Sequence, residues 1–431
     1  MSGATTTGGA DRHISIDAVR GFAVLGILLM NIVGMGLPAF AYIDPTYAGG
    51  ATGADFWTWA VNNVLTDGKM RALFTMLFGA SAVLIAERAE GGRPGPVQTH
   101  YRRMFWLLIF GMLHAYFLWW GDILVTYALA GLVIFPFRRI DWRAQVGVGV
   151  AVLAALLAFN LLEARELAAL HAAAVAPGAT PAALKAWQEA AQLVAPSPEL
   201  KALELTGFRG GFMDALQARA QVAKLLQMYM MPTNEIPEAI GQMFLGMALF
   251  RRGFFTLGWS NRAYLTTIAI GYLLAAPATA WTTWMIQQSG FEPLTLNRLE
   301  AWQQISRPLV GLAHASVILM LVRAGAARGV VNRLAAAGRM AFSNYLMTSI
   351  ITIITMLPVA VAPKTGMDAY QPLGTVIVSG LLIGTALSLL VIPVMHAVVD
   401  DLGNALRRRR PTGGQDGDDA PVTREELETV S

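Results

Sequence analysis

Residues 101–139 read YRRMFWLLIFGMLHAYFLWWGDILVTYALAGLVIFPFRR, two apolar segments that are flanked by arginine and joined at a Gly-Asp pair. His114 lies inside the first segment, and Asp122 lies at the junction. An ionisable side chain at a bilayer centre costs roughly 2.5 kcal/mol or more unless it has a polar partner or a water-filled cavity. We therefore expect this stretch to carry the functional site.

The composition places the whole chain in the membrane. Of its 431 residues, 55% are hydrophobic and 14% are charged, whereas a soluble domain has about 25% charged residues. The absence of cysteine excludes a thiol nucleophile, disulfides and thiolate metal sites. The first apolar run is too long for a signal-peptide core and lacks a convincing cleavage site, so we expect no cleaved signal peptide.

Apolar runs near the roughly 20 residues that cross a hydrocarbon core recur along the chain and predict an all-α, polytopic bundle of about ten transmembrane helices. The predicted spans are 14–36, 71–86, 104–120, 123–137, 145–162, 236–250, 263–286, 308–322, 340–357 and 373–396. They form an N-terminal transmembrane half, 13–162, and a C-terminal half, 236–400.

Arginine gathers in every second connection between these spans, namely 88–103, 138–143, 251–262, 323–339 and 407–410. Positively charged loops stay on the cytoplasmic side of a membrane. The alternation predicts that both termini lie in the cytoplasm, and it places the Gly-Asp turn on the outer side. Despite the net charge of +4, these clusters indicate topology and membrane lipids as neighbours rather than a nucleic-acid partner. A homodimer is compatible with the sequence.

Three regions lie outside the spans. Residues 163–235 are rich in alanine and carry mixed charges at helical spacing, which predicts an extracytoplasmic insert of two or three amphipathic helices. These helices either lie on the bilayer, cap a cavity, or pack together without any chemistry. Residues 401–431 form the predicted cytoplasmic tail. Residues 1–12 and the tail from Pro411 onward have the composition of disordered segments.

The first span carries three polar candidates. Asp17 and Arg20 are three residues apart on one helix face near the cytoplasmic end, so they can form an ion pair. Alternatively, the guanidinium binds an anionic group such as a phosphate, for which its fork of donors is suited. Asn31 lies further along the span, where asparagine either bonds to a neighbouring helix or acts as a donor to substrate.

Lys69 and Arg71 break the charge rule because the predicted topology puts them on the outer face. They either reach lipid headgroups, pair with Asp67 or Asp122, or hold a substrate anion.

Asp122 follows His114 by eight residues, about 12 Å along a continuous helix. The two side chains meet only if the chain bends, which Gly121 permits. Otherwise Asp122 caps the next span and His114 is satisfied by another helix. Because imidazole is the usual general base near neutral pH, we predict that the pair is functional. Trp119 and Trp120 mark the membrane interface, with stacking on a sugar as the alternative.

His314 follows Arg307 by seven residues and therefore shares its helix face. It is a candidate for the same cavity as His114. The sequence has no G-x-S-x-G elbow, no H-E-x-x-H and no Gly-rich loop ending in Lys-Ser or Lys-Thr. Nucleophile-elbow hydrolysis and P-loop ATP hydrolysis are therefore disfavoured, and no metal is expected.

Four stretches resemble the YeiB-like bacterial membrane proteins, a domain family of unknown function. They are SIDAVRGFAVLGILLMNI (15–32), DGKMRALFTMLFG (67–79), RRMFWLLIFGMLHAYFLWWGDILVTYALAG (102–131) and AAGRMAFSNYLMTSII (336–351). This family is similar to a superfamily of transmembrane acyltransferases that includes the lysosomal heparan-α-glucosaminide N-acetyltransferase. The resemblance implies ten or eleven helices that pass an acyl group from cytoplasmic acyl-CoA, acetyl-CoA being one candidate, to a hydroxyl or amine of a glycan, lipid or small molecule outside.

The resemblance also implies roles. His114 would deprotonate the acceptor, Asp122 would orient His114 or bind the acceptor, and Asn31, Lys69 or Arg71 would stabilise the oxyanion. Contacts to CoA would come from Asp17, Arg20, Arg339, Asn344 and Tyr345, and contacts to the acceptor from Trp119, Trp120, Arg307 and His314. The hypothesis needs a hydrophilic chamber that opens inward near the first span and reaches the His114 ring.

One departure keeps alternatives open. The sugar N-acetyltransferase has its catalytic histidine in the outer loop after the first span, whereas residues 36–55 of this chain contain Asp44 and Asp55 but no histidine. Either the base is His114 or the activity has changed. The competing hypotheses are a proton-coupled transporter or flippase that uses His114, Asp122, Lys69 and Arg71, and a non-catalytic scaffold of the envelope.

Overall fold

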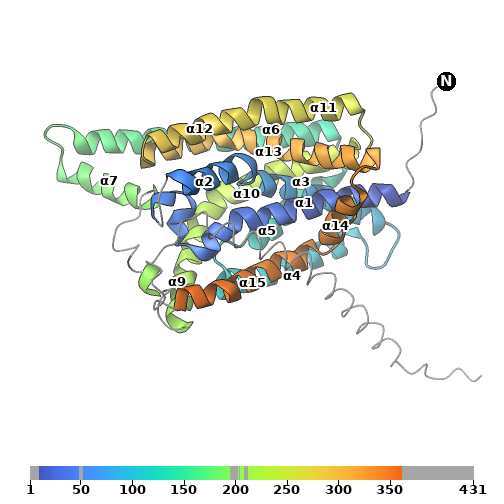
Figure 1. The fold of residues 1–431 in the computed structure, drawn as a ribbon, viewed down its shortest axis with the longest axis horizontal. Coiled ribbons are helices and arrows are strands. Elements are labelled where there is room, and N and C mark those ends of the chain that lie inside the picture. Colours follow the sequence, from blue (N-terminus) through green and yellow to red (C-terminus); the bar gives the residue numbers. More distant parts are fainter. Residues whose placement is uncertain (1–8, 48–51, 195–201, 203, 208–211, 362–431) are drawn as a thin grey trace, which may run out of the picture. The chain divides into compact units, whose positions relative to one another are not determined.

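The computed structural model describes residues 9–47, 52–194, 202, 204–207 and 212–361 (Figure 1). Within that part every regular element is a helix, which confirms the predicted all-α class. The predicted span 373–396 and the tail 401–431 lie outside the described residues.

The N-terminal half contains six α-helices with short 3₁₀ and π turns between them. The α-helices are α1 (Gly9–Gly36), α2 (Gly53–Leu65), α3 (Lys69–Arg88), α4 (Pro96–Leu113), α5 (Leu124–Ile134) and α6 (Trp142–Val175). The short turns are η1 (Ala39–Tyr42), η2 (Pro45–Tyr47), η3 (His114–Leu118) and η4 (Phe135–Arg139). The turn η3 is π-helical and continues α4.

The described part of the chain from residue 181 onward also consists of α-helices, with π-helical turns between some of them. Its elements are α7 (Pro181–Val194), α9 (Phe212–Leu225), η5 (Leu226–Glu235), α10 (Ile236–Arg251), α11 (Asn261–Ala269), η6 (Ile270–Ala275), α12 (Ala276–Gln288), α13 (Pro293–Ala324), α14 (Arg328–Arg339) and α15 (Ala341–Val361). The π-helical turn η6 joins α11 to α12 into one long helical run.

Within the described residues, five helical runs are long and apolar enough to cross a membrane. They are Ile14–Gly36, Gly53–Arg88, Trp142–Val175, Asn261–Gln288 and Pro293–Ala324. The chain is therefore a membrane protein, while the count of about ten spans stays a prediction. Exposed side chains such as Leu273 and Leu274 on η6 and Phe105 on α4 suit contact with lipid.

Helix α6 is longer than predicted. Its 34 residues span about 51 Å, which exceeds the roughly 30 Å of a hydrocarbon core. Its end therefore continues into the predicted insert, where the His171 ring packs on Trp187 of α7 with 4.6 Å between the ring centroids. The described part of the insert is helical, as predicted.

Sequence analysis missed α14, which lies in a basic connection and packs along α1. The two backbones touch at a pair of glycines. A Cβ added to Gly338 would lie 1.8 Å from the Asp17 carbonyl oxygen, and one added to Gly21 would lie 1.8 Å from that of Leu334. Only glycine therefore allows this contact, which places Arg339 beside the start of α1.

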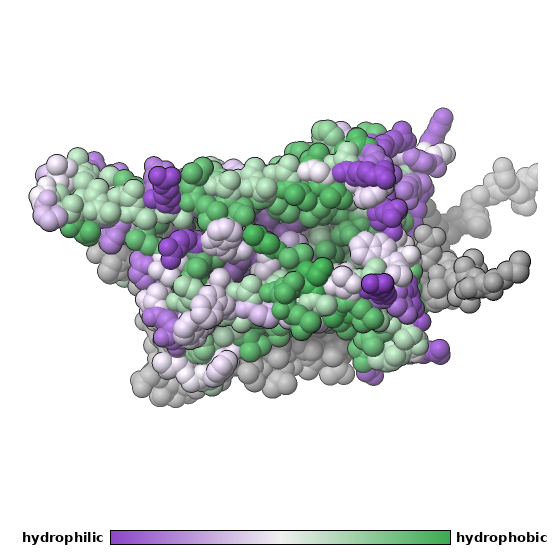
Figure 2. All heavy atoms as spheres, turned by 90° about the horizontal axis from the view of Figure 1, so that it is seen from above, coloured by the Kyte–Doolittle hydropathy of each residue, from purple (hydrophilic) through white to green (hydrophobic). Residues whose placement is uncertain are grey.

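Arginine-bearing connections meet at one end of the bundle. Arg139 forms an ion pair of 2.9 Å with Glu90, Arg251 donates to the Arg138 carbonyl, and Arg323 donates to Asn261 at 2.6 Å. Figure 2 shows hydrophilic side chains gathered at the end where α11 and α14 lie, next to an apolar middle. Helices α7 and α9 lie at the opposite end (Figure 1).

Candidate functional site

The predicted pair of His114 and Asp122 forms because the chain reverses after α4. The Trp119 amide donates to the His114 carbonyl at 2.8 Å and closes the π turn. Trp119 then leaves the helix in an extended conformation, with φ −152° and ψ 126°. The chain returns toward α4, and Asp122 Oδ1 lies 2.9 Å from His114 Nδ1.

The position of the bend corrects the expectation for Gly121. The reversal starts at Trp119, and Gly121 instead supplies room, because a Cβ there would lie 2.4 Å from the Trp119 ring. Trp119 itself is buried and donates its indole N–H to the Gly34 carbonyl at 3.0 Å. This hydrogen bond fastens Trp119 to the end of α1, and its place at the membrane interface stays a prediction. Trp120 also packs against Gly34.

Asp122 both contacts His114 and caps the next helix. Its Oδ2 accepts a hydrogen bond of 2.9 Å from the Val125 amide and caps α5, while Oδ1 faces His114. The side chains of His114 and Asp122 are 0% and 1% exposed. Within the described residues, His114 Nδ1 and Asp122 Oδ1 have no partner other than each other. Since an unpaired buried polar group is costly, each atom depends on this contact.

Ser349 of α15 completes a chain of three groups that sequence analysis missed. Its Oγ lies 2.9 Å from His114 Nε2, and it is fully buried. It is 235 residues away from His114 in the sequence. No short motif marks Ser349, because the three groups come from α15, η3 and the turn before α5. The one signal is that Ser349 falls inside AAGRMAFSNYLMTSII, one of the four stretches that carry the family resemblance.

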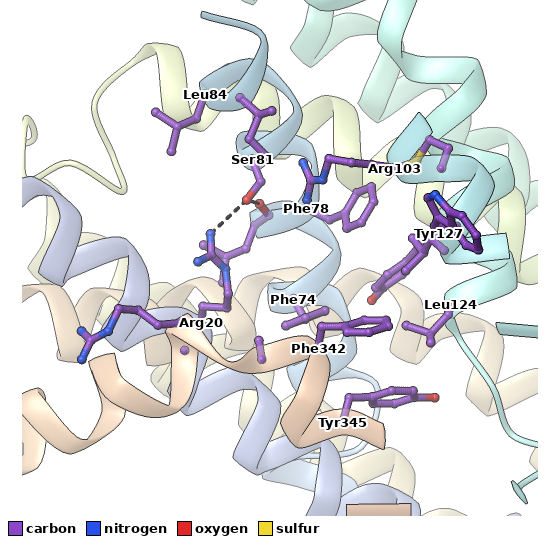
Figure 3. Close-up of a pocket in the computed structure, with 18 of the residues that line it drawn as sticks. Arg20, Phe74, Phe78, Ser81, Leu84, Arg103, Leu124, Tyr127, Phe342 and Tyr345 are labelled. Atoms are coloured by element: carbon purple, nitrogen blue, oxygen red, sulfur yellow. Dashed lines mark hydrogen bonds between the residues drawn. The ribbon is translucent and has the colours of Figure 1, made fainter. Parts of the chain in front are cut away.

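A cavity of about 940 Å³ lies between α1, α3, α4 and α15 (Figure 3). Among the described residues, five arginines line it: Arg20, Arg88, Arg102, Arg103 and Arg339. Arg20 pairs with Asp17 at 2.8 Å, as predicted, and donates to Ser81 at 3.0 Å. The remaining wall is largely apolar and aromatic, and Figure 3 shows Phe74 and Phe342 between Arg20 and Tyr127.

Tyr345 separates this cavity from His114. It lines the cavity together with Ile123, whose amide donates to the Tyr345 hydroxyl at 3.2 Å. Behind it, the His114 ring lies 5.1 Å away between ring centroids. Neither His114, Asp122 nor Ser349 lines the cavity. The expected hydrophilic chamber that reaches His114 is therefore a mainly apolar cavity that ends one aromatic layer short of the imidazole.

Arg71 lies in a second polar cluster, and Lys69 is held separately. Glu238 of α10 binds Arg71 at 3.0 Å and Arg307 at 3.7 Å, and it accepts a hydrogen bond of 3.0 Å from Gln242. Lys69 is buried and donates to the Asn63 carbonyl. Sequence analysis missed Glu238. Neither cation reaches out to headgroups, since buried acceptors hold both.

The remaining candidates have structural partners or lie apart. His314 uses both ring nitrogens, with Tyr272 Oη at 2.6 Å from Nδ1 and the Leu65 carbonyl at 2.9 Å from Nε2. It shares no partner with His114. Asn344 donates to the Ala337 carbonyl at 2.9 Å and does not line the cavity. Asn31 is buried on α1.

The arrangement suits proton transfer between a hydroxyl and an imidazole that a carboxylate holds. Within the part of the chain that the structure describes, no group of three or more His, Asp or Glu side chains is placed to hold a metal ion. A carboxylate that holds one imidazole nitrogen leaves the other free to exchange a proton with a hydroxyl.

Comparison with known proteins finds relatives of unknown function. Residues 249–395 match the family described as "Protein of unknown function (DUF418)". Uncharacterized protein YeiB of Escherichia coli is 29% identical over 349 residues, which is 79% of this chain and 82% of YeiB. Uncharacterized protein YxaH of Bacillus subtilis is 35% identical over 129 residues, 29% of this chain and 32% of YxaH. No solved structure matches significantly.

Proposed function

We propose that this protein transfers an acyl group from acyl-CoA to a hydroxyl or amine acceptor. The chain belongs to the YeiB-like family of membrane proteins, and it carries a buried His-Asp pair beside an arginine-lined cavity. The cavity is the observation that carries the proposal. CoA has charged phosphates at one end and a slender uncharged arm that ends in the thioester. A pocket with guanidinium groups and aromatic walls offers complementary surfaces for both parts.

The arginines would bind the phosphates, since a guanidinium donates two parallel hydrogen bonds to phosphate oxygens. Of the residues predicted to contact CoA, Asp17, Arg20, Arg339 and Tyr345 line the cavity. The acyl arm would lie between Phe78 and Phe342 with the thioester near Tyr345. Tyr345 has to turn aside for the thioester to reach His114.

His114 would act as the general base. Asp122 Oδ1, which lies 2.9 Å from Nδ1, would hold a proton on that nitrogen. The Nε2 lone pair would then be free to take the proton of an attacking hydroxyl or amine. Arg71 is held by Glu238 and Lys69 by the Asn63 carbonyl. The proposal therefore gives these two cations no part in stabilising the oxyanion.

The arginine-rich end of the bundle would face the cytoplasm of a bacterial inner membrane, because positively charged loops are retained there. Both termini would then be cytoplasmic. CoA would enter from the inner side and the acceptor, a glycan, lipid or small molecule, from the outer side.

Binding of CoA tests the proposal. Saturating CoA at about 100 times its Kd should stabilise the purified protein by ~2.7 kcal/mol, measured as a rise in melting temperature. Arg103→Ala should remove most of this rise, since Arg103 lines the cavity. Arg139→Ala is the matched control, because Arg139 is exposed and binds Glu90. The proposal is contradicted if millimolar CoA does not raise the melting temperature of wild type, or if it raises that of Arg103→Ala by as much as that of wild type.

A proton-coupled transporter is the second candidate, and the Arg71–Glu238–Arg307 cluster favours it. Buried ionisable groups inside a membrane bundle are common in proton relays. This candidate predicts proton flux in proteoliposomes that Glu238→Gln abolishes, together with indifference to CoA. The acyltransferase predicts the opposite pair of results.

A further inference from the structure

Ser349 makes its short contact with His114 rather than with its own helix. Serine and threonine hydroxyls inside helices commonly bond to the carbonyl four residues back. Thr75, Ser81 and Ser316 do so at 2.8, 2.7 and 2.8 Å. For Ser349 that distance, to the Tyr345 carbonyl, is 3.4 Å, while His114 Nε2 lies at 2.9 Å. The Ser349 hydroxyl is therefore directed at the imidazole.

We infer that Ser349 is a nucleophile that carries the acyl group covalently between CoA and the acceptor. The inference rests on the proposed function for the identity of the donor. Ser349 Oγ, His114 and Asp122 Oδ1 form a continuous chain with contacts of 2.9 Å on both sides of the imidazole. In an activated serine, one imidazole nitrogen takes the hydroxyl proton while a carboxylate holds the other.

The position of Ser349 links the cavity to the imidazole. Tyr345 lies one helical turn earlier on the same face of α15 and lines the cavity. An acyl group that passes the Tyr345 ring therefore meets Ser349 next. The complete burial of Ser349 also keeps water away. Exclusion of water protects a reactive intermediate from hydrolysis, which suits a transferase more than a hydrolase.

The reaction balances with groups that are already named. In the first step, Ser349 Oγ attacks the thioester carbonyl carbon and its proton moves to His114 Nε2. The carbon–sulfur bond breaks, and the leaving sulfur takes that proton to become the CoA thiol. In the second step, His114 removes a proton from the acceptor, which attacks the acyl-serine. The carbon–Oγ bond breaks, and Oγ regains a proton from His114.

A fluorophosphonate probe tests the nucleophile independently of CoA, since it phosphonylates an activated serine and releases fluoride. The full-length protein in detergent is incubated with the probe and mapped by mass spectrometry. We expect label on Ser349, none at that position in Ser349→Ala, and a labelling rate in His114→Gln that is lower by a factor on the order of 100 or more. Thr348→Ala is the matched control. Its hydroxyl neighbours Ser349 on α15 and bonds the Tyr345 carbonyl at 2.8 Å, so labelling should persist.

A second measurement uses radiolabelled acetyl-CoA without an acceptor. We expect one acetyl group on Ser349, and in Ser349→Cys a thioester that neutral hydroxylamine cleaves. Folding of each variant is checked by its melting temperature. Absence of label from folded wild-type protein, or thiol release by Ser349→Ala at the wild-type rate, overturns the inference. If Ser349→Ala still releases thiol at the wild-type rate and CoA still stabilises the protein, the acyl group passes directly from CoA to the acceptor. The proposed acyl transfer then remains, without an acyl-serine.

Discussion

Two of the buried polar clusters in the described part of the bundle differ in how each group is held. In the first, His114 has one partner on each ring nitrogen, Ser349 on one side and Asp122 on the other. In the second, Glu238 is contacted by three donors, which are Arg71, Arg307 and Gln242.

The difference indicates which of the two clusters stabilises the fold. Several hydrogen-bond donors and opposite charges around a carboxylate offset the free-energy cost of its desolvation. The Glu238 cluster can therefore hold α3, α10 and α13 together. The single contacts around His114 leave Nε2 beside a hydroxyl proton, which suits proton transfer. Sequence patterns predicted a function for His114 and Asp122 and left the roles of Lys69 and Arg71 open, although all four are ionisable groups in apolar surroundings.

The largest expected effect concerns His114. His114→Ala should lower release of the CoA thiol from acetyl-CoA by a factor on the order of 10²–10⁴, since the base for the reaction is gone. CoA-dependent stabilisation should persist, because Arg103 and the other cavity arginines are unchanged. The rate is measured with a thiol reagent and the stabilisation by thermal melting. An equal loss of both would mean that His114 supports the fold rather than the reaction, and the comparison would break.

Glu238 should show the reverse pattern. Glu238→Ala leaves the partly buried Arg71 and Arg307 guanidinium groups without this carboxylate, which should cost about 1–3 kcal/mol, the range for a buried donor that loses its partner. The melting temperature should therefore fall strongly, while the folded fraction keeps its fluorophosphonate labelling at Ser349. A Glu238→Ala protein that melts like wild type but no longer reacts would assign the second cluster to function.

Much of the fold followed from periodicity and charge. The apolar runs located most of the helices, and the arginine alternation agrees with the contacts between Arg139 and Glu90 and between Arg251 and Arg138. Helix α14 was missed because its arginines dominate a short amphipathic segment. It becomes a helix by packing its glycine face on α1, which is a tertiary contact that no local pattern encodes.

The site was predictable only in part. The spacing of His114 and Asp122 indicated a pair if the chain bent, and the pair is confirmed. Ser349 and Glu238 come from α15 and α10, which approach the site only in the folded bundle. His314 carried the same local signal as His114, yet Tyr272 and the Leu65 carbonyl occupy its two nitrogens. The two histidines differ in the acceptor on the second nitrogen, which is the Asp122 carboxylate for His114 and a backbone carbonyl for His314. Sequence does not show which acceptor a histidine meets when its partners come from other elements.

A glycine substitution sharpens the comparison at the arginine end of the cavity. Gly338→Ala puts a Cβ against the Asp17 carbonyl and should destabilise the protein by ~1–3 kcal/mol through overpacking. It should also weaken CoA-dependent stabilisation, because α14 carries Arg339 and would move away from Arg20. Gly329→Ala on the same helix has open space around its Cβ and should leave both quantities unchanged. Equal behaviour of the two variants would remove α14 from the proposed donor site.

The smallest expected effect is a pH dependence at the start of α13, the helix that carries Arg307. Glu292 caps this helix by accepting from the Leu294 and Thr295 amides at 3.0 and 2.7 Å. Burial opposes ionisation of Glu292, but the hydrogen bonds from Thr295 and Leu294 outweigh it and lower the pKa of its carboxyl. A lowered folded pKa adds stability above the unfolded value of about 4.3, and this stability is lost as the pH falls through the folded pKa.

Glu292→Gln should therefore cost ~0.5–1 kcal/mol at pH 7, the range of a lost helix cap, and the difference from wild type should shrink as the carboxyl becomes protonated. Denaturant melts at pH 7 and pH 3 measure the change. Fluorophosphonate labelling of Ser349 should be equal in the two proteins at pH 7, because α13 carries Arg307 of the Glu238 cluster and contributes no residue to the chain of Ser349, His114 and Asp122. If the labelling rate is lower in Glu292→Gln than in wild type, the two clusters are coupled.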